Sequence, residues 1–175
     1  MGEKNSECDD GITKTEVDWD GHPMNYTCYH PTSPLLPTLL PSTLECENLP
    51  KDYLPKHFCM EDAISYDNPI PHHGNHRPIW PKFGEYKFVP PQRWLHNIEH
   101  GAVVMLYHPC AHNSMVNKLR NIVTSCIRKH IISPHTNIPE NKVCKVGSFS
   151  FLMLFILAIG LGRMGMPSAY VSCRC

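Results

Sequence analysis

A six-residue apolar run, Ala102 to Tyr107, constrains the fold of this chain more than any other feature. It includes two β-branched residues and is bounded by Gly101 and Pro109. A run this short, with no polar break, is typical of a strand buried on both faces of a sheet. We therefore expect the rest of the fold to be built around this strand.

The flanking segments predict a small α+β domain. Residues 85–89 alternate between charged and aromatic side chains, as in a half-exposed strand, and Pro90 and Pro91 stop the pattern. A turn or short helix is expected over 92–100. From 113 to 131, apolar residues recur at spacings of three and four, which predicts one amphipathic helix packed on the sheet and ended by Ser133-Pro134. The apolar face of that helix is Met115, Val116, Leu119, Ile122, Val123, Cys126 and Ile127, with Cys126 expected in the core.

Charge and proline divide the chain into unlike halves. Residues 1–70 carry 13 acidic and 4 basic side chains, whereas residues 71–175 carry 3 acidic and 12 basic. We expect two solvated faces, or a basic face toward a membrane or an acidic partner. No run of basic residues indicates nucleic-acid binding. With 17 prolines, long irregular Pro- and His-rich segments are expected, including an irregular or disordered segment over 1–27.

Nine cysteines are many for 175 residues. None of the first four forms a C-x-x-C pair, a spacing that favours disulfides over a zinc finger. A glycosylation sequon at Asn25 agrees with a secreted side, whereas the polar, acidic residues 1–21 do not resemble a signal peptide, so a cytosolic chain with reduced thiols stays an alternative. The disulfide candidates are Cys8, Cys28, Cys46, Cys59 and Cys110, the last paired with Cys126 or with an N-terminal cysteine.

A second apolar stretch lies near the C-terminus. Residues 149–161 are apolar except for Ser150 and Gly160, and the segment extends back to Val146. We predict a hydrophobic helix over 146–162 that crosses the membrane once, followed by a tail over 163–175. Its length is just below the roughly 17–25 residues that a spanning helix needs.

Histidines gather before the central strand. Seven of the twelve lie between residues 72 and 112, and His96, Glu99 and His100 fall within five residues. Imidazole groups suit transition metals such as zinc. One hypothesis is therefore a metal site of His76, His96 and His100, with His72 or His73 as a further ligand and Glu99 orienting a histidine.

Two alternatives stay open for these histidines. His96-x-x-Glu99-His100 matches the H-x-x-E-H motif of metal-dependent hydrolases, with Glu99 as the catalytic base. However, the helix before Gly101 is short, and Glu140 is the only acidic residue downstream, so an enzyme is the less favoured reading. In the other alternative, the histidines bond backbone carbonyl groups of a Pro-rich loop.

Three segments carry a family resemblance. Residues 73–78 (His-Gly-Asn-His-Arg-Pro), 83–101 (through Trp-Leu-His-Asn-Ile-Glu-His-Gly) and 106–112 (Leu-Tyr-His-Pro-Cys-Ala-His) resemble the tumour protein p53-inducible protein 13 family. The likeness is to that family's uncharacterised domain, which also occurs in bacterial envelope proteins. The resemblance implies a single-pass membrane protein, linked to growth suppression and stress response, with no established enzymatic activity. It implies His76, His96, Glu99 and His100 as the motif positions.

These observations lead to one expected organisation. A family domain over 28–141 stands on the extracytoplasmic side of a membrane and binds a protein partner or a metal without catalysing a reaction. The resemblance departs after about residue 141, where the family continues with a strand that is not expected here. A metal-dependent hydrolase and a soluble truncated form of the domain are the alternatives.

Overall fold

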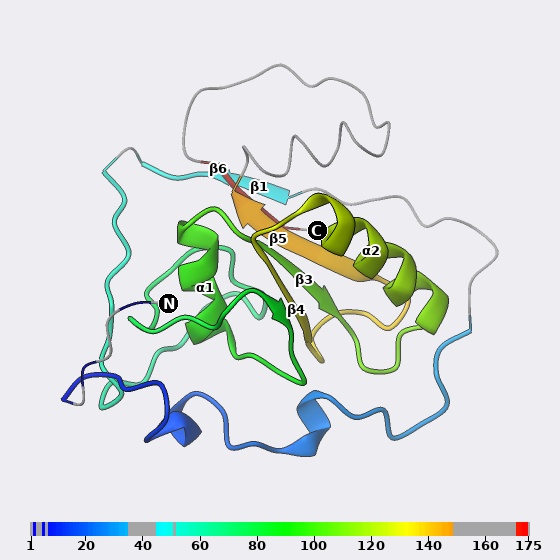
Figure 1. Ribbon diagram of the computed structural model, residues 1–175, viewed down its shortest axis with the longest axis horizontal. Helices are drawn as coiled ribbons and strands as arrows, with labels where there is room; N and C mark the ends of the chain where they lie inside the picture. Colours follow the sequence, from blue (N-terminus) through cyan, green and yellow to red (C-terminus); the bar gives the residue numbers. More distant parts are fainter. Residues whose placement is uncertain are drawn as a thin grey trace.

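The computed structural model describes residues 2, 5, 7–34, 45–50, 52–148 and 171–174. A mixed sheet with the strand order β1-β6-β5-β3-β4-β2 organises this part of the chain, so the predicted α+β class is confirmed (Figure 1). The strands are β1 (Glu45–Asn48), β2 (Gly84–Glu85), β3 (Val103–Tyr107), β4 (His130–Pro134), β5 (Val143–Ser148) and β6 (Val171–Arg174). The α-helices are α1 (Pro91–Glu99) and α2 (Asn113–Cys126), and two short 3-10 helices, η1 (Thr15–Val17) and η2 (Pro23–Asn25), precede the sheet.

Strand β3 is the centre of the sheet, as its apolar run predicts. It pairs in parallel with β4 and antiparallel with β5. Val104 and Leu106 join the apolar cluster on the α1 face, whereas Val103 and Met105 join the cluster on the α2 face. All four side chains are buried. The strand is therefore covered on both faces, one by each helix.

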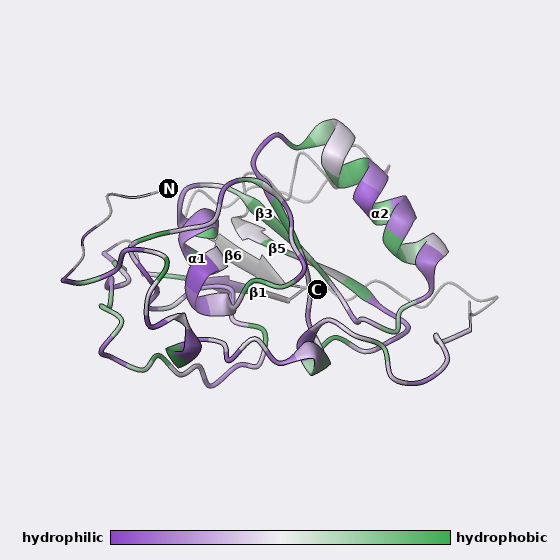
Figure 2. Cartoon of the chain, turned by 60° about the horizontal axis from the view of Figure 1, so that its bottom comes forward, coloured by the Kyte–Doolittle hydropathy of each residue, from purple (hydrophilic) through white to green (hydrophobic). Residues whose placement is uncertain are grey.

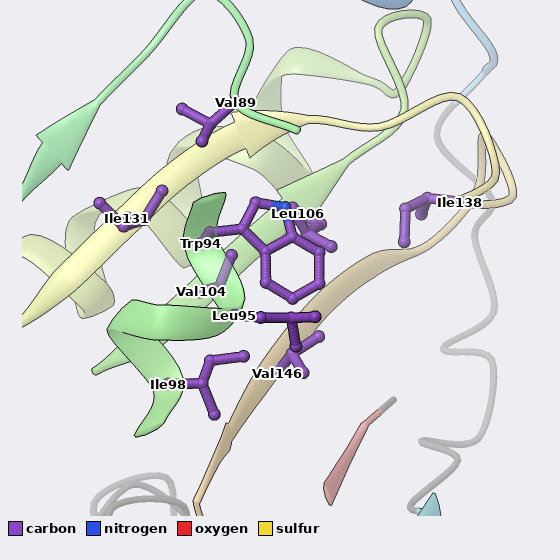
Figure 3. Close-up of a cluster of buried hydrophobic side chains, with 9 residues drawn as sticks. All are labelled: Val89, Trp94, Leu95, Ile98, Val104, Leu106, Ile131, Ile138 and Val146. Atoms are coloured by element: carbon purple, nitrogen blue, oxygen red, sulfur yellow. The ribbon is translucent and has the colours of Figure 1, made fainter. Parts of the chain in front are cut away.

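Helix α1 is held against the sheet by Trp94. Pro91 opens this helix at a position where the missing backbone N–H costs nothing. The Trp94 side chain is fully buried, and Figure 3 shows it among Leu95, Leu106 and Val146. Because Trp94, Leu95 and Ile98 of α1 enter this core, the last turn of the helix is held against the sheet.

Helix α2 is shorter than its sequence pattern predicts. Hydrophobic and hydrophilic residues alternate along it (Figure 2), and Val116, Leu119 and Val123 are buried. The predicted end at residue 131 is wrong, because the helix ends at Cys126 and β4 begins at His130. Ile131 and Ile132 are β-branched neighbours whose side chains enter opposite clusters, which a strand allows and a helix does not.

The predicted strand over 85–89 is mostly wrong. Only Gly84 and Glu85 form β2, which pairs in parallel with β4, and the Tyr86 N–H donates to the Ile132 carbonyl. Farther along, the Val89 N–H donates to the Ser133 hydroxyl oxygen and not to a backbone carbonyl. The two prolines that follow leave no room for a longer ladder.

The C-terminal prediction also needs correction. Val146 to Ser148, the start of the predicted membrane helix, belong to β5, which pairs with β3 through Met105 and Lys145. The expectation that no strand follows residue 141 is therefore wrong. Residues 149–162 lie outside the described part of the chain. Neither α-helix in that part has the length and hydrophobicity to cross a membrane.

The N-terminal segment follows an irregular path but is tied to the domain by buried ion pairs. Asp18 accepts from both Nε and an Nη group of Arg77, at 2.9 and 2.7 Å, and both side chains are at most 2% exposed. Asp9 accepts from Arg93 at 2.6 Å. Acidic residues of the first half thus pair with basic residues of the second, so the expectation that both faces are solvated fails for these pairs.

Burial of His135 makes stability depend on pH. His135 follows β4, and burial lowers the pKa of its imidazole to about 4. Between pH 6.5 and 4 the unfolded chain binds a proton that the folded chain does not. The free energy of unfolding therefore falls on acidification, by about 1.4 kcal/mol per pH unit for this residue.

We expect His135→Asn to flatten that dependence, measured by urea unfolding at several pH values in this range. His22→Asn, at an exposed position, serves as the matched control. An unchanged slope in His135→Asn would show that His135 does not couple folding to protonation.

Candidate metal centre

Two buried histidines form the base of the site. His76, in the long segment between β1 and β2, is 1% exposed, and His96, on α1, is 3% exposed. Nδ1 of His76 bonds the Gly74 carbonyl at 2.9 Å, and Nδ1 of His96 bonds the Arg77 carbonyl at 2.7 Å. A carbonyl only accepts, so each Nδ1 carries the proton. In the neutral rings, both Nε2 atoms therefore hold free lone pairs.

A backbone bridge brings a third histidine to the same place. The His76 N–H donates to the Lys56 carbonyl at 3.1 Å, and the Phe58 N–H donates to the His76 carbonyl at 3.0 Å. This pair of bonds sets His57 beside His76, with ring centroids 5.0 Å apart. The His57 ring also stacks on His96 at 4.6 Å.

Glu99 closes the group from the last residue of α1. Its Oε2 atom lies 3.2 Å from Nε2 of His76, 3.8 Å from Nε2 of His57 and 4.0 Å from Nε2 of His96. One ligand atom from each of these four residues lies within 4.8 Å of all the others. We call this group, His57, His76, His96 and Glu99, the histidine–carboxylate cluster.

His100 and Trp80 stand beside the cluster. Nε2 of His100 is 3.1 Å from Nε2 of His96, and the two rings stack. Trp80 lies over both rings, with centroids 4.2 Å from His96 and 4.7 Å from His100. His100 is exposed and does not belong to the group of mutually close ligand atoms. The sequence-predicted trio thus meets in space, with His100 next to the group.

The electrostatic environment keeps the buried rings neutral. Burial lowers the pKa of His96 to about 3, against the hydrogen bond to Arg77 that raises it. Burial also lowers the pKa of His76, while its bond to Gly74 and the charge of Glu99 act in the opposite direction. At neutral pH both rings present lone pairs rather than protons, which is the form that binds metals.

The spacing of the four ligand atoms fits a small cation. Ligands about 2.0–2.1 Å from a tetrahedral zinc ion lie roughly 3.3 Å from one another. The Glu99–His76 separation of 3.2 Å already matches, whereas the separations of 3.8 and 4.0 Å and the others, of up to 4.8 Å, must shorten on binding. His57 and Glu99, which must move, are the partly exposed members, with side chains 46% and 33% exposed.

The other predicted histidine ligands lie elsewhere. Nε2 of His73 and Nε2 of His72 face Oε2 of Glu47 on β1, at 3.1 and 3.4 Å. The Tyr53 hydroxyl lies 3.1 Å from Nδ1 of His73. The hydrogen bond from His73 lowers the pKa of Glu47. His72 and His73 therefore form a separate group with Glu47 and do not join His76.

Among the cysteines whose side chains the structure describes, four form two disulfides. Cys8 pairs with Cys59, and Cys28 pairs with Cys110, so the alternative pairing of Cys110 with Cys126 is wrong. Cys126 is a free thiol and is exposed, which corrects its predicted place in the core. Cys46 lies opposite Cys173 in the β1–β6 register, and neither side chain is described.

Asn25 is half-buried in η2. Its Oδ1 atom accepts from the Trp19 indole at 3.1 Å. Glycosylation there stays a prediction.

Sequence reasoning missed His57 and Trp80. His57 lies 19 positions before His76, in an irregular segment where no spacing rule applies. The bridge that joins them is made by backbone N–H and carbonyl groups, so the residue types at these positions do not reveal it. Trp80, in contrast, lies in the same Pro-rich loop as His76, and an aromatic residue there was a usable signal of a partly closed site.

Fold and site define a small disulfide-linked α+β domain with a histidine–carboxylate cluster beside its central strand. Residues 57–147 match the family described as a protein of unknown function, DUF3105. The match covers more than half of the chain, which therefore belongs to this family. All four members of the cluster lie within the matched region, as does all of β5 except Ser148. No curated protein and no solved structure matches the chain.

Proposed function

We propose that this domain binds one transition-metal ion through His57, His76, His96 and Glu99. The observation that carries the proposal is the shared orientation of the two buried rings. Each is held by a carbonyl at Nδ1, and each directs Nε2 toward Oε2 of Glu99. In metal-binding histidines, a hydrogen bond from the ring nitrogen that does not bind the metal fixes the tautomer and the orientation of the ring. If the histidines served only to bond backbone carbonyl groups, this would explain the contacts of the Nδ1 atoms. It would not explain why the Nε2 atoms point toward the same carboxylate oxygen of Glu99.

Zinc suits this donor set best. Three imidazole nitrogens and one carboxylate oxygen are borderline ligands that also accept copper, nickel or iron. The ligands come from three segments, around His57, around His76 and on α1. An ion held by all three joins the irregular loops to the helix, and its binding free energy adds to the stability of the fold.

Titration of the oxidised full-length chain tests the proposal. We expect one equivalent of Zn²⁺ or Co²⁺ per chain, with a rise in melting temperature on binding. Bound cobalt should show the visible bands of a nitrogen–oxygen site. Failure to bind either ion at micromolar concentration would refute the proposal.

A metal-dependent hydrolase is the second candidate, favoured by the 3.1 Å approach of His96 and His100 at Nε2. In that case Glu99 acts as a base on metal-bound water rather than as a ligand. Glu99→Gln separates the two functions. A ligand role predicts weaker metal binding, whereas a base role predicts normal binding with turnover of an ester or peptide lost.

We also propose that the chain works in an oxidising compartment and is attached to a membrane, as its resemblance to the p53-inducible protein 13 family implies. The two disulfides support the compartment, because such bonds persist outside the cytosol. The apolar stretch 149–161 supports attachment. Alkaline carbonate extraction of membranes from expressing cells tests it, and release of the chain into the supernatant would contradict it.

A further inference from the structure

We propose that the Cys28–Cys110 pair is a redox-controlled zinc site: a disulfide when oxidised, and two thiolate ligands with His30 when reduced. Cys28, His30 and Cys110 form one group of mutually close ligand atoms, and Cys110 belongs to a second group with His108 and Glu140. Among the described residues, no such group includes Cys8 or Cys59. The two disulfides therefore stand in different surroundings.

His30 shares the Nδ1 contact of His76 and His96, although its side chain is 54% exposed. Its Nδ1 bonds the Pro31 carbonyl at 3.1 Å, and its Nε2 lies 3.6 Å from Sγ of Cys110. The same Nε2 is 3.2 Å from Oε1 of Glu140. An imidazole with its Nδ1 held by a carbonyl and its Nε2 beside a sulfur atom is oriented to share a metal ion with that sulfur.

The partners stay together without the S–S bond. The Ser33 N–H donates to the Cys110 carbonyl at 2.9 Å, and the Ser33 hydroxyl donates to Glu140. These contacts join the segment after Cys28 to the loops that follow β3 and β4. Ligand sites are common at the carboxyl ends of parallel strands, where such loops meet.

The reduced sulfur atoms must separate to bind one ion. Two thiolates on a tetrahedral zinc ion lie about 3.8 Å apart, from Zn–S bonds of about 2.3 Å. Cys110 is 2% exposed, whereas Cys28 is half-buried, so we expect Cys28 to be the side chain that moves. Glu140 or His108 is available as a fourth ligand, and two thiolates with an imidazole favour zinc over magnesium or calcium.

The chemical steps balance with a dithiol reductant. The dithiol transfers two electrons and two protons to the Cys28–Cys110 bond, which becomes two thiols while the reductant becomes a disulfide. Zn²⁺ then displaces the two protons and binds both thiolates. Reoxidation by a disulfide oxidant transfers two electrons from the thiolates to the oxidant, which takes up two protons from solvent and becomes two thiols, while the S–S bond re-forms and the ion is released. Neither step involves His57, His76, His96 or Glu99, so the site is independent of the proposed function.

Cobalt titration of the full-length chain before and after reduction tests this inference. Thiolate ligation gives a sulfur-to-cobalt charge-transfer band in the near ultraviolet, which a nitrogen–oxygen site lacks. We expect one additional equivalent of thiolate-bound cobalt after reduction by a phosphine, and its loss on adding oxidised glutathione. Other cysteines are controlled by comparing Cys28→Ser, which should lose that equivalent, with Cys8→Ser, which should keep it.

His30→Ala keeps every cysteine and provides a second test. We expect it to weaken binding of the additional cobalt by about tenfold or more, whereas His22→Ala, at an exposed position of the same segment, should not. Equal binding by His30→Ala and His22→Ala would overturn the inference. So would equal thiolate-bound cobalt in Cys28→Ser and Cys8→Ser, or a near-ultraviolet circular dichroism signal lost on reduction and not restored by metal.

Discussion

Replacement of His96 by alanine is expected to weaken zinc binding by at least about a hundredfold, since loss of even a residue that only orients a ligand costs roughly 10–100-fold. His96 contributes one of the two buried Nε2 atoms and is held by the Arg77 carbonyl. Its removal leaves His76 without its partner at the base of the site. Isothermal titration of the oxidised full-length chain measures the change.

His135→Ala is the matched control for that variant. His135 is also a buried histidine, placed directly after β4, but it lies outside the cluster. Both variants open a cavity of one imidazole, so a general loss of packing would affect them alike. Equal zinc affinity in His96→Ala and His135→Ala would exclude His96 as a ligand.

Replacement of Asp18 by alanine is expected to lower the free energy of unfolding by about 3–5 kcal/mol, the usual cost of leaving a buried charge unpaired. The Arg77 guanidinium is fully buried, and Asp18 is the carboxylate that receives its Nε–H and Nη–H groups. The other Nη bonds of Arg77 go to the carbonyl groups of residues 58, 59 and 62, which do not neutralise the charge. Urea unfolding with the disulfides intact measures the loss.

Glu16→Ala provides the comparison for Asp18→Ala. Glu16 is an exposed acidic residue in η1, two positions away, and its replacement should change stability by no more than about 0.5 kcal/mol. Similar stability of the two variants would show that Asp18 does not neutralise Arg77. The Asp18–Arg77 ion pair also links stability to the site, because the backbone carbonyl of Arg77 orients His96.

The sequence identified the parts of the fold that depend on short-range pattern. The apolar run before Tyr107 predicts β3, and the three–four spacing from Asn113 predicts α2. It misassigned β4 because the apolar pattern of α2 continues through Ile127 to Ile131, and only pairing with β3 turns the last residues into a strand. The end of β5 looked like the start of a membrane helix for the same reason, because only pairing with β3 makes it a strand.

The cluster was predictable where its residues share one helix. His96 and Glu99 lie on the last turn of α1 and His100 follows it, so their spacing alone brings them together. His76 was assigned correctly to their neighbourhood, but His72 and His73, only a few residues earlier, face Glu47 instead. Loop residues such as His57 are positioned by long-range backbone bonds, for which residue type carries no signal.

X-ray absorption at the zinc edge of the oxidised, zinc-loaded full-length chain tests the central claim most directly. The histidine–carboxylate cluster predicts a first shell of nitrogen and oxygen atoms only, with the outer scattering pattern of about three imidazole rings on a four-coordinate ion. A sulfur atom in that shell, or a spectrum with fewer than two imidazoles, would contradict it.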